Sequence, residues 1–416
     1  MQHLQPFALF EARASGTLSK KQEAFLNQYT QGTWSVNPAT GLVDVQGSFD
    51  CSGWNLSKRK KLKSLVGIQF GTVTGYFSCT DNKLTDLEGA PQTVGGKFDC
   101  QHNLLISLVG APQTVGGTFD CHDNLLTSLA EAPQTVTGEF NCSGNQLTSL
   151  VGAPQTVTGG FRCVWNQLTT LKGAPQQVEG GFNCGANQKM TSLAGAPQKV
   201  TGEFNCSGNR LTSLVGAPQT VTGEFNCSGN QLTSLVGSPQ KVGGHFFCDR
   251  NQLTSLAGAP QTVEGSFSSD NNKLTSLVEA PQTVGWSFDC SDNPLTSLAG
   301  APQTVGGYFW CDAFELETDQ WNLAGWFQVL REGDPAARRL VVTLPIFDAQ
   351  FWLGRLKGDL KQDGQTLLQL ADLWGRNGWK EVQAQLQQEL DPAQLRVIQA
   401  LRGKLAYVDP WQDFKL

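Results

Sequence analysis

One pattern of apolar and polar positions repeats along most of this chain. Residues 211–231 print it in full as Leu-Thr-Ser-Leu-Val-Gly-Ala-Pro-Gln-Thr-Val-Thr-Gly-Glu-Phe-Asn-Cys-Ser-Gly-Asn-Gln. The spacing is 21 residues, except for 22 between Cys184 and Cys206, where Gln188, Lys189 and Met190 carry the extra residue. Ser269 replaces the cysteine once. A fixed period of this length is typical of a solenoid, whose coils bury their apolar faces against their neighbours. The cysteine recurs at Cys79, Cys100, Cys121, Cys142, Cys163, Cys184, Cys206, Cys227, Cys248, Cys290 and Cys311.

Each repeat predicts the course of one coil. The Phe-x-Cys step alternates apolar, polar and apolar residues, so it predicts a parallel strand of about three residues with Phe and Cys pointing inward. Leu-x-x-Leu and the later Val complete the core, while Gly-Ala-Pro forbids a helix in the return arm. An Asn three residues after each Cys can satisfy backbone groups of adjacent coils and form a ladder. We predict a repeat solenoid of about 12 coils over residues 64–311, with helix-free return arms.

A small α+β cap is predicted over residues 18–63. Ser19 and Gln22 form a capping box, and Phe25, Leu26 and Tyr29 then lie on one face of a short helix. Residues 34–45 alternate around an Asn-Pro-Ala-Thr-Gly turn, which favours a hairpin. Residues 49–51 already copy Phe-x-Cys and indicate an irregular first coil. A cap is expected because the first coil would otherwise expose an apolar end and an unpaired edge.

The register Phe-x-Cys-x-x-Asn-x-Leu-x-x-Leu resembles the Leu-x-Leu-x-x-Asn-x-Leu core of leucine-rich repeats, above all the short, helix-free bacterial type. The resemblance covers residues 65–311, with Phe and Cys in place of the strand leucines. The whole chain also resembles an uncharacterised group of phage and marine bacterial repeat proteins, through the Gly-Thr-Trp-Ser-Val-Asn-Pro motif at residues 32–38 and the Thr-Gly-Leu-Val-Asp-Val motif at residues 40–45. No activity is implied by that second resemblance.

Residues 1–17 form an N-terminal appendage that is open to two interpretations. Leu9-Phe10-Glu11 followed by Ala12 resembles the cleavage signal of phage prohead proteases, which would cut after Glu11 and make the segment a targeting peptide. The alternative is a terminus that docks Phe7 and Phe10 on the domain.

The period stops after Cys311, and residues 312–416 predict an all-α C-terminal domain of five or six short helices. Asp334-Pro335 and Asp391-Pro392 are typical of helix starts. The domain is either a C-terminal cap with an aromatic core or an effector that the solenoid targets. Its tryptophans are Trp321, Trp326, Trp352, Trp374, Trp379 and Trp411.

The composition of the chain limits which partners it can bind and which cellular compartment it can occupy. The chain has 416 residues, 39% of them hydrophobic, and a net charge of −6. Its one basic run, residues 58–61 with Lys63, is expected to be a solvated loop, so neither nucleic acid nor a membrane is expected as a partner. Twelve cysteines in one column, without a Cys-x-x-Cys pair, indicate buried free thiols rather than disulfides or zinc ligands. We therefore expect a cytoplasmic or virion location, without secretion through a signal peptide.

Catalytic chemistry finds little support. Residues 312–416 contain neither His nor Cys, which excludes a Cys-His or Ser-His mechanism there, and no glycine-rich phosphate loop follows a strand. His102 and His122 lie one coil apart near Asp99, Asp120 and Asp123 and could in principle hold a metal ion, but exposed polar ladders are usual on repeats. We predict no catalytic residue, no metal site, no cofactor and no enzymatic activity.

Comparison among repeats points to a candidate binding surface. The core columns barely change, whereas the columns that flank Phe and follow Cys do. Two places depart from small polar residues: the Trp165 patch and the Phe247 patch. We hypothesise a protein-binding face anchored there; the alternatives are a structural or virion-associated protein, or a subunit that self-associates through its caps. The Trp165 patch comprises Arg162, Val164 and Trp165, and the Phe247 patch comprises His245, Phe247, Asp249 and Arg250.

Overall fold

The computed structural model describes residues 18–53, 61–312 and 314–316. These residues divide into two compact units: one contains the chain up to Gln252 together with Gly258–Phe267, and the other contains Leu253–Ala257 and the chain from Ser268 onward. The appendage with Glu11, the basic run at 58–60 and nearly all of the predicted helical domain lie outside the described residues. Within the described ranges, no helix has both the length and the apolar composition that a membrane crossing requires.

The first unit begins with the predicted helix and hairpin. Helix α1 (Lys20–Tyr29) is preceded by Ser19, and the capping box between Ser19 and Gln22 is present. Leu26 is buried, and the ring of Phe25 lies 5.7 Å from that of Phe49. Strand β1 (Thr30–Val36) pairs antiparallel with β2 (Val43–Asp50). The helix thus places an aromatic side chain against the first residue of the phenylalanine column.

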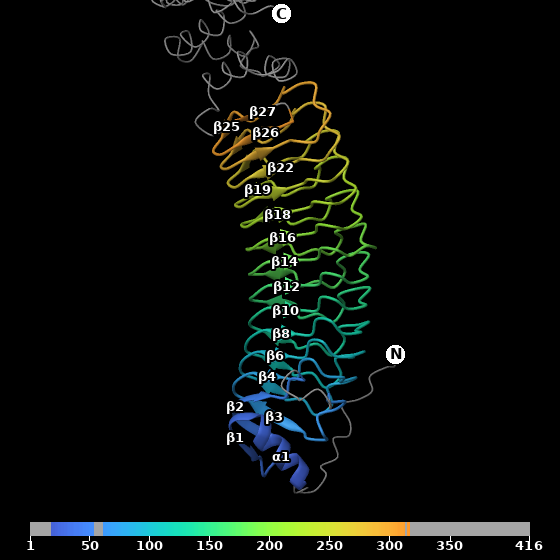
Figure 1. Ribbon diagram of the computed structural model, residues 1–416, viewed down its shortest axis with the longest axis vertical. Coiled ribbons are helices and arrows are strands. Elements are labelled where there is room, and N and C mark those ends of the chain that lie inside the picture. The colour runs from blue at the N-terminus through green and yellow to red at the C-terminus, as the bar shows by residue number, and fades with distance from the viewer. Residues whose placement is uncertain (1–17, 54–60, 313, 317–416) are drawn as a thin grey trace, which may run out of the picture. The chain divides into compact units, whose positions relative to one another are not determined.

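Strand β2 is the origin of two parallel ladders. Its first half pairs with β3 (Phe70–Val73) and its second half with β4 (Phe77–Ser78). Every later coil of the unit then contributes one strand to each ladder, stacked in chain order (Figure 1). The predicted solenoid of short parallel strands is therefore confirmed, and residues 61–312 contain no helix.

From β4 onward, the strands of this unit are two residues long, shorter than predicted, because the paired register ends at the residue after Phe. The Phe ladder continues with β6 (Phe98–Asp99), β8 (Phe119–Asp120), β10 (Phe140–Asn141), β12 (Phe161–Arg162), β14 (Phe182–Asn183), β16 (Phe204–Asn205), β18 (Phe225–Asn226) and β20 (Phe246–Phe247). The second ladder, which the sequence did not predict as strand, is formed by the Thr-Val step: β5 (Thr93–Val94), β7 (Thr114–Val115), β9 (Thr135–Val136), β11 (Thr156–Val157), β13 (Gln177–Val178), β15 (Lys199–Val200), β17 (Thr220–Val221), β19 (Lys241–Val242) and β21 (Thr262–Val263).

The core consists of columns that run from coil to coil. From Phe77 to Phe225, successive rings lie 5.3 to 5.8 Å apart with planes within 14°. These phenylalanines, the cysteines between Cys79 and Cys248, and the leucines of the unit's Leu-x-x-Leu steps are buried. Met190 takes the place of the first leucine in the 22-residue repeat, so the insertion leaves the core column intact.

All twelve cysteines are buried free thiols. Several donate to the carbonyl of the strand residue in the next coil: Cys121 Sγ lies 3.3 Å from the Asn141 oxygen and Cys142 Sγ lies 3.4 Å from the Arg162 oxygen. In the second unit, Ser269 Oγ donates the equivalent hydrogen bond to the backbone carbonyl oxygen of Asp289 at 3.1 Å. The cysteine column therefore acts as a weak donor as well as an apolar filler, which is why Ser fits the one exception.

The predicted asparagine ladder is present. Asn124 Nδ2 donates to the carbonyls of Cys100, in the preceding coil, and of Cys121, in its own coil, both at 3.1 Å. Its Oδ1 accepts from the backbone N–H of Leu105 at 3.0 Å. One side chain thus satisfies backbone groups of two coils that have no strand partner.

The second unit repeats the same coil. Strand β23 (Thr283–Val284) pairs with β25 (Thr304–Val305), and β24 (Phe288–Asp289) pairs with β26 (Phe309–Cys311). Strand β27 (Phe314–Leu316) then reverses direction and pairs antiparallel with β26. The division between the units falls within β22 (Phe267–Ser268).

Candidate functional site

The surface that carries the candidate residues is the strand face, which we define by four columns per coil. These are the residue before Phe, the residue between Phe and Cys, and the two residues after Cys. The last of the four has a left-handed backbone in both glycine and non-glycine coils, with φ of 63° at Gly144, 52° at Trp165 and 52° at Arg250. Its N–H bonds the carbonyl of the next coil, as from Trp165 to Gly185 at 3.4 Å. The turn therefore dictates the conformation whichever residue occupies it.

The Trp165 patch is the most exposed aromatic feature of the strand face in the first unit. Trp165 is 68% exposed, Arg162 is exposed and Val164 is half-buried. Arg162 Nε lies 2.8 Å from Glu139 Oε2, and this hydrogen bond raises the pKa of the Arg162 guanidinium. A bulky residue in the left-handed region costs about 1 kcal/mol relative to glycine. Trp165 is therefore both strained and solvated.

Small residues follow Trp165 on the next coil. Arg162 is paired in register with Asn183, and the other strand-face positions of that coil are Gly181, Gly185 and Ala186. These side chains leave one side of the indole without a large neighbour on the strand face.

The side chains of the Phe247 patch make more contacts within the chain than the sequence predicts. The rings of His245 and Phe247 are stacked with centroids 5.5 Å apart and planes within 8°, and Phe247 is half-buried. His245 Nδ1 accepts from the Ser266 N–H at 3.0 Å, and Ser228 Oγ donates to Asp249. Arg250 is the exposed member, at 74%. The patch thus offers a stacked aromatic pair beside a solvated guanidinium.

The two patches lie on the same ladder. Four register steps connect β12 to β20 through β14, β16 and β18. At about 4.8 Å per strand, the patches are about 19 Å apart. The outward strand residues between them are asparagines, and Glu203 and Glu224 precede their phenylalanines. The strand face therefore presents two anchors separated by a polar, acidic stretch.

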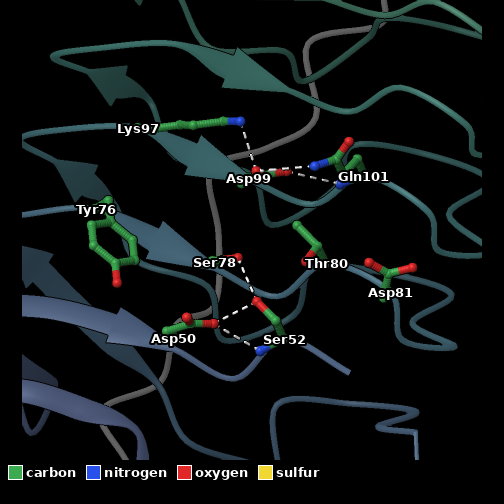
Figure 2. A pocket seen from close by; sticks show the side chains of 9 residues that line it. All are labelled: Asp50, Ser52, Tyr76, Ser78, Thr80, Asp81, Lys97, Asp99 and Gln101. Atoms are coloured by element: carbon green, nitrogen blue, oxygen red, sulfur yellow. Dashed lines mark hydrogen bonds and ion pairs between the residues drawn. The ribbon is translucent and has the colours of Figure 1, made fainter. Parts of the chain in front are cut away.

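An open polar hollow of about 410 Å³ lies on the strand face of the earliest coils. Figure 2 shows Ser52 bonded to Asp50 and Ser78 on one side and Lys97 bonded to Asp99 on the other. Burial raises the pKa of Asp99. No apolar anchor lines this hollow except the ring of Tyr76, so it fits small polar groups better than a hydrophobic ligand.

Some exposed apolar residues lie outside the predicted patches. Leu104, Leu125 and Ile106 are exposed where other repeats place Gln, Lys or Thr. In the second unit, Trp286 is 62% exposed, and the rings of Tyr308 and Trp310 stack with centroids 5.4 Å apart. The same comparison finds Tyr308 and Trp310 in the first two strand-face columns, and it finds the others when it is extended to the neighbouring columns. The histidine pair noticed in the sequence is also brought together, because His102, His122 and Asp123 cluster on the strand face.

Comparison with known proteins adds one structural likeness. Among solved structures, the chain is similar to YopM from Yersinia enterocolitica WA-314, with 22% sequence identity and a TM-score of 0.47. The match covers 63% of this chain and 57% of that protein, so this chain spans less than two thirds of it. No protein-family model matches the chain, and no curated protein matches it.

Proposed function

We propose that this protein is a non-enzymatic interaction module that presents its strand face to a protein partner. The observation that carries the proposal is Trp165, a 68% exposed indole at a left-handed position where other coils place Gly or smaller or polar residues such as Ala, Asp and Asn. Most of the indole is uncovered in the folded chain, so folding gains little from a large residue there. A strained, solvated aromatic side chain is instead typical of a surface whose stabilising contacts come from a partner.

The exposed area of Trp165 is large enough for the side chain to anchor a partner. An aromatic side chain buries up to about 250 Å², so about 170 Å² of Trp165 is available to a partner. At about 25 cal/mol per Å² this corresponds to about 4 kcal/mol before the costs of association. After those costs, a loss of about 1 to 3 kcal/mol on truncation is expected, and its upper part reaches the threshold of about 2 kcal/mol for an interface hot spot.

The charge around the anchors defines the partner further. Arg162 is already paired with Glu139, and Glu203 and Glu224 lie between the patches. A complementary partner therefore brings an apolar pocket for the indole and basic groups at its rim, which speed association.

Several features favour binding over catalysis. The cysteines are buried, and burial raises the pKa of thiols such as Cys206, to about 12, so that nucleophilic thiolates are not available.

A structural role is the second candidate, including a virion component or a subunit that self-associates through its caps. Light scattering after size-exclusion chromatography separates the two, because a structural subunit associates alone, whereas an interaction module is monomeric until its partner is added.

The proposal is tested by crosslinking followed by affinity measurement. A photoreactive residue at Val164 should crosslink one partner that the same residue at Gln219, on the return arm, does not capture. With that partner purified, Trp165→Ala and Phe247→Ala should each weaken binding by about 1 to 3 kcal/mol. Gln219→Ala is the matched control and should bind normally. If Gln219→Ala abolishes binding while both aromatic variants bind normally, the strand face is not the interface.

A further inference from the structure

Three potential metal ligands of the first unit converge on the strand face of two adjacent coils. His102 and Asp123 occupy the same left-handed turn position, with φ of 53° and 50°, and His122 immediately precedes Asp123. The backbone N–H of His102 bonds the carbonyl of His122 at 3.1 Å. The ladder therefore holds the three backbones side by side.

The side chains point toward one another. One ligand atom from each of His102, His122 and Asp123 lies within 4.8 Å of the other two. His102 Nε2 is 3.0 Å and His122 Nε2 is 4.0 Å from the same Asp123 Oδ2. Ligand atoms around a tetrahedral zinc ion are about 3.3 Å apart, given bond lengths of about 2.0 to 2.2 Å. Small rotations of these partly exposed side chains would bring them to that geometry.

A second set of carboxylates orients the imidazoles. Asp120 Oδ1 lies 2.6 Å from His122 Nδ1, which makes Nδ1 the protonated nitrogen and leaves the Nε2 lone pair free to bind a metal ion. Asp81 Oδ1 lies 3.5 Å from His102 Nδ1, whereas the hydrogen bond of this ring joins Nε2 to Asp123, so a metal ion at Nε2 would leave the ring proton on Nδ1 beside Asp81. Lys97 Nζ holds the other Asp120 oxygen at 3.3 Å. Carboxylates behind ligating histidines are the usual supports of protein metal sites.

The charge balance favours a cation at the centre. Asp81, Asp120 and Asp123 surround the two imidazoles, and His102 has a carboxylate oxygen near each ring nitrogen. A neutral imidazole can donate to only one of those oxygens. His102 Nε2 and Asp123 Oδ2 are 3.0 Å apart, and a metal ion bound by both would replace the proton that they share.

We propose that His102, His122 and Asp123 bind a divalent transition-metal ion, with Asp81 and Asp120 as positioning residues. Two imidazoles and one carboxylate suit Zn²⁺ or a similar ion and disfavour Ca²⁺ and Mg²⁺, which take oxygen ligands. The three side chains are 44%, 24% and 50% exposed, so a further coordination position faces solvent. The proposal replaces the sequence-based expectation of an ordinary polar ladder at this place.

Calorimetric titration of chelator-treated, reduced full-length protein with Zn²⁺ at pH 8 tests the site. One ion should bind per chain. His102→Ala, His122→Ala and Asp123→Asn should each weaken its affinity at least tenfold, and Asp123→Asn keeps a residue suited to the left-handed turn. Asp120→Asn should weaken it by a smaller factor. His245 lies in the Phe247 patch, away from the proposed ligands, so His245→Ala is the matched control and should bind zinc as the unaltered chain does.

Cobalt(II) provides the spectroscopic readout. The bound ion should show visible ligand-field bands without a thiolate charge-transfer band, because the cysteines are buried. Absence of saturable binding would mean that protons alone bridge these residues and would overturn the proposal. A thiolate band, or full affinity in the His102→Ala/His122→Ala double variant, would place the ion elsewhere and overturn it equally. Circular dichroism of each variant confirms that the solenoid is folded.

Discussion

Replacing Asn145 by Ala tests how much one ladder asparagine stabilises the solenoid. Asn145 Oδ1 accepts from the buried Leu126 N–H at 2.9 Å, and Nδ2 donates to the carbonyls of Cys121 and Cys142 at 3.1 Å. Each of those carbonyls also accepts from a neighbouring asparagine, Asn124 or Asn166, so neither loses every donor. The Leu126 N–H keeps no such second partner. One orphaned buried donor costs about 1 to 3 kcal/mol and each weakened bond about 0.5, so the expected loss is about 3 kcal/mol.

Urea denaturation followed by far-ultraviolet circular dichroism measures that loss. Gln146→Ala, at the exposed next residue, is the matched control and should change stability by less than about 0.5 kcal/mol. Hydrogen exchange should show faster exchange at the Leu126 amide in Asn145→Ala alone. Equal denaturation midpoints for the two variants would refute the assignment of the asparagines as backbone supports.

Four further outcomes are expected. Phe204→Asp and Cys206→Asp should each unfold several coils, since a buried unpaired charge costs several kcal/mol. Asn205→Asp should be nearly silent, because Asn205 Oδ1 accepts a hydrogen bond from the Ser207 N–H at 3.0 Å and a carboxylate oxygen can accept it equally. Equal effects at all three sites would contradict the inward and outward assignment. Titration of the denatured, unreduced protein should find close to twelve thiols, whereas recovery of only a few would contradict the free-cysteine column. Burial raises the pKa of native thiols such as Cys100. Their contribution to stability is therefore complete below the unfolded-state pKa and is lost as the pH rises above it, by about 1.4 kcal/mol for each thiol and each pH unit. Denaturation midpoints that do not fall between pH 8 and pH 10 would argue against burial. Trp165→Gly should leave the free energy of unfolding unchanged or raise it by about 1 kcal/mol, because it relieves the left-handed strain, and a clear loss of stability would show that the indole serves folding.

The sequence predicts the inward half of this fold well and the outward half only in part. Repetition makes Phe, Cys, Leu and Asn columns obvious, and each column has one physical role that burial enforces, as Phe98 and Asn103 show. The Thr-Val ladder was missed because two residues leave no measurable alternation. The thiol donors, and Ser269 as their substitute, depend on where the next coil's carbonyl lies, which a linear pattern does not contain.

Outward residues are less predictable because no core constrains them. Phe247 and Trp165 look alike as departures from their columns, yet Phe247 stacks on His245 while Trp165 is solvated. His102 and His122 are 20 residues apart in the sequence, and only the coil register and the rotamers bring Nε2 of both toward Asp123. The predicted N-terminal and C-terminal cap roles and the cleavage after Glu11 stay predictions.

The central claim is that Trp165 anchors a partner on the strand face, and the affinity of the crosslinked, purified partner tests it most directly. Isothermal titration should give a dissociation constant for Trp165→Ala that is about 5 to 150 times that of the unaltered chain, which corresponds to about 1 to 3 kcal/mol. Gln219→Ala should bind as the unaltered chain does. An unchanged dissociation constant for Trp165→Ala, with Gln219→Ala impaired, would contradict the account.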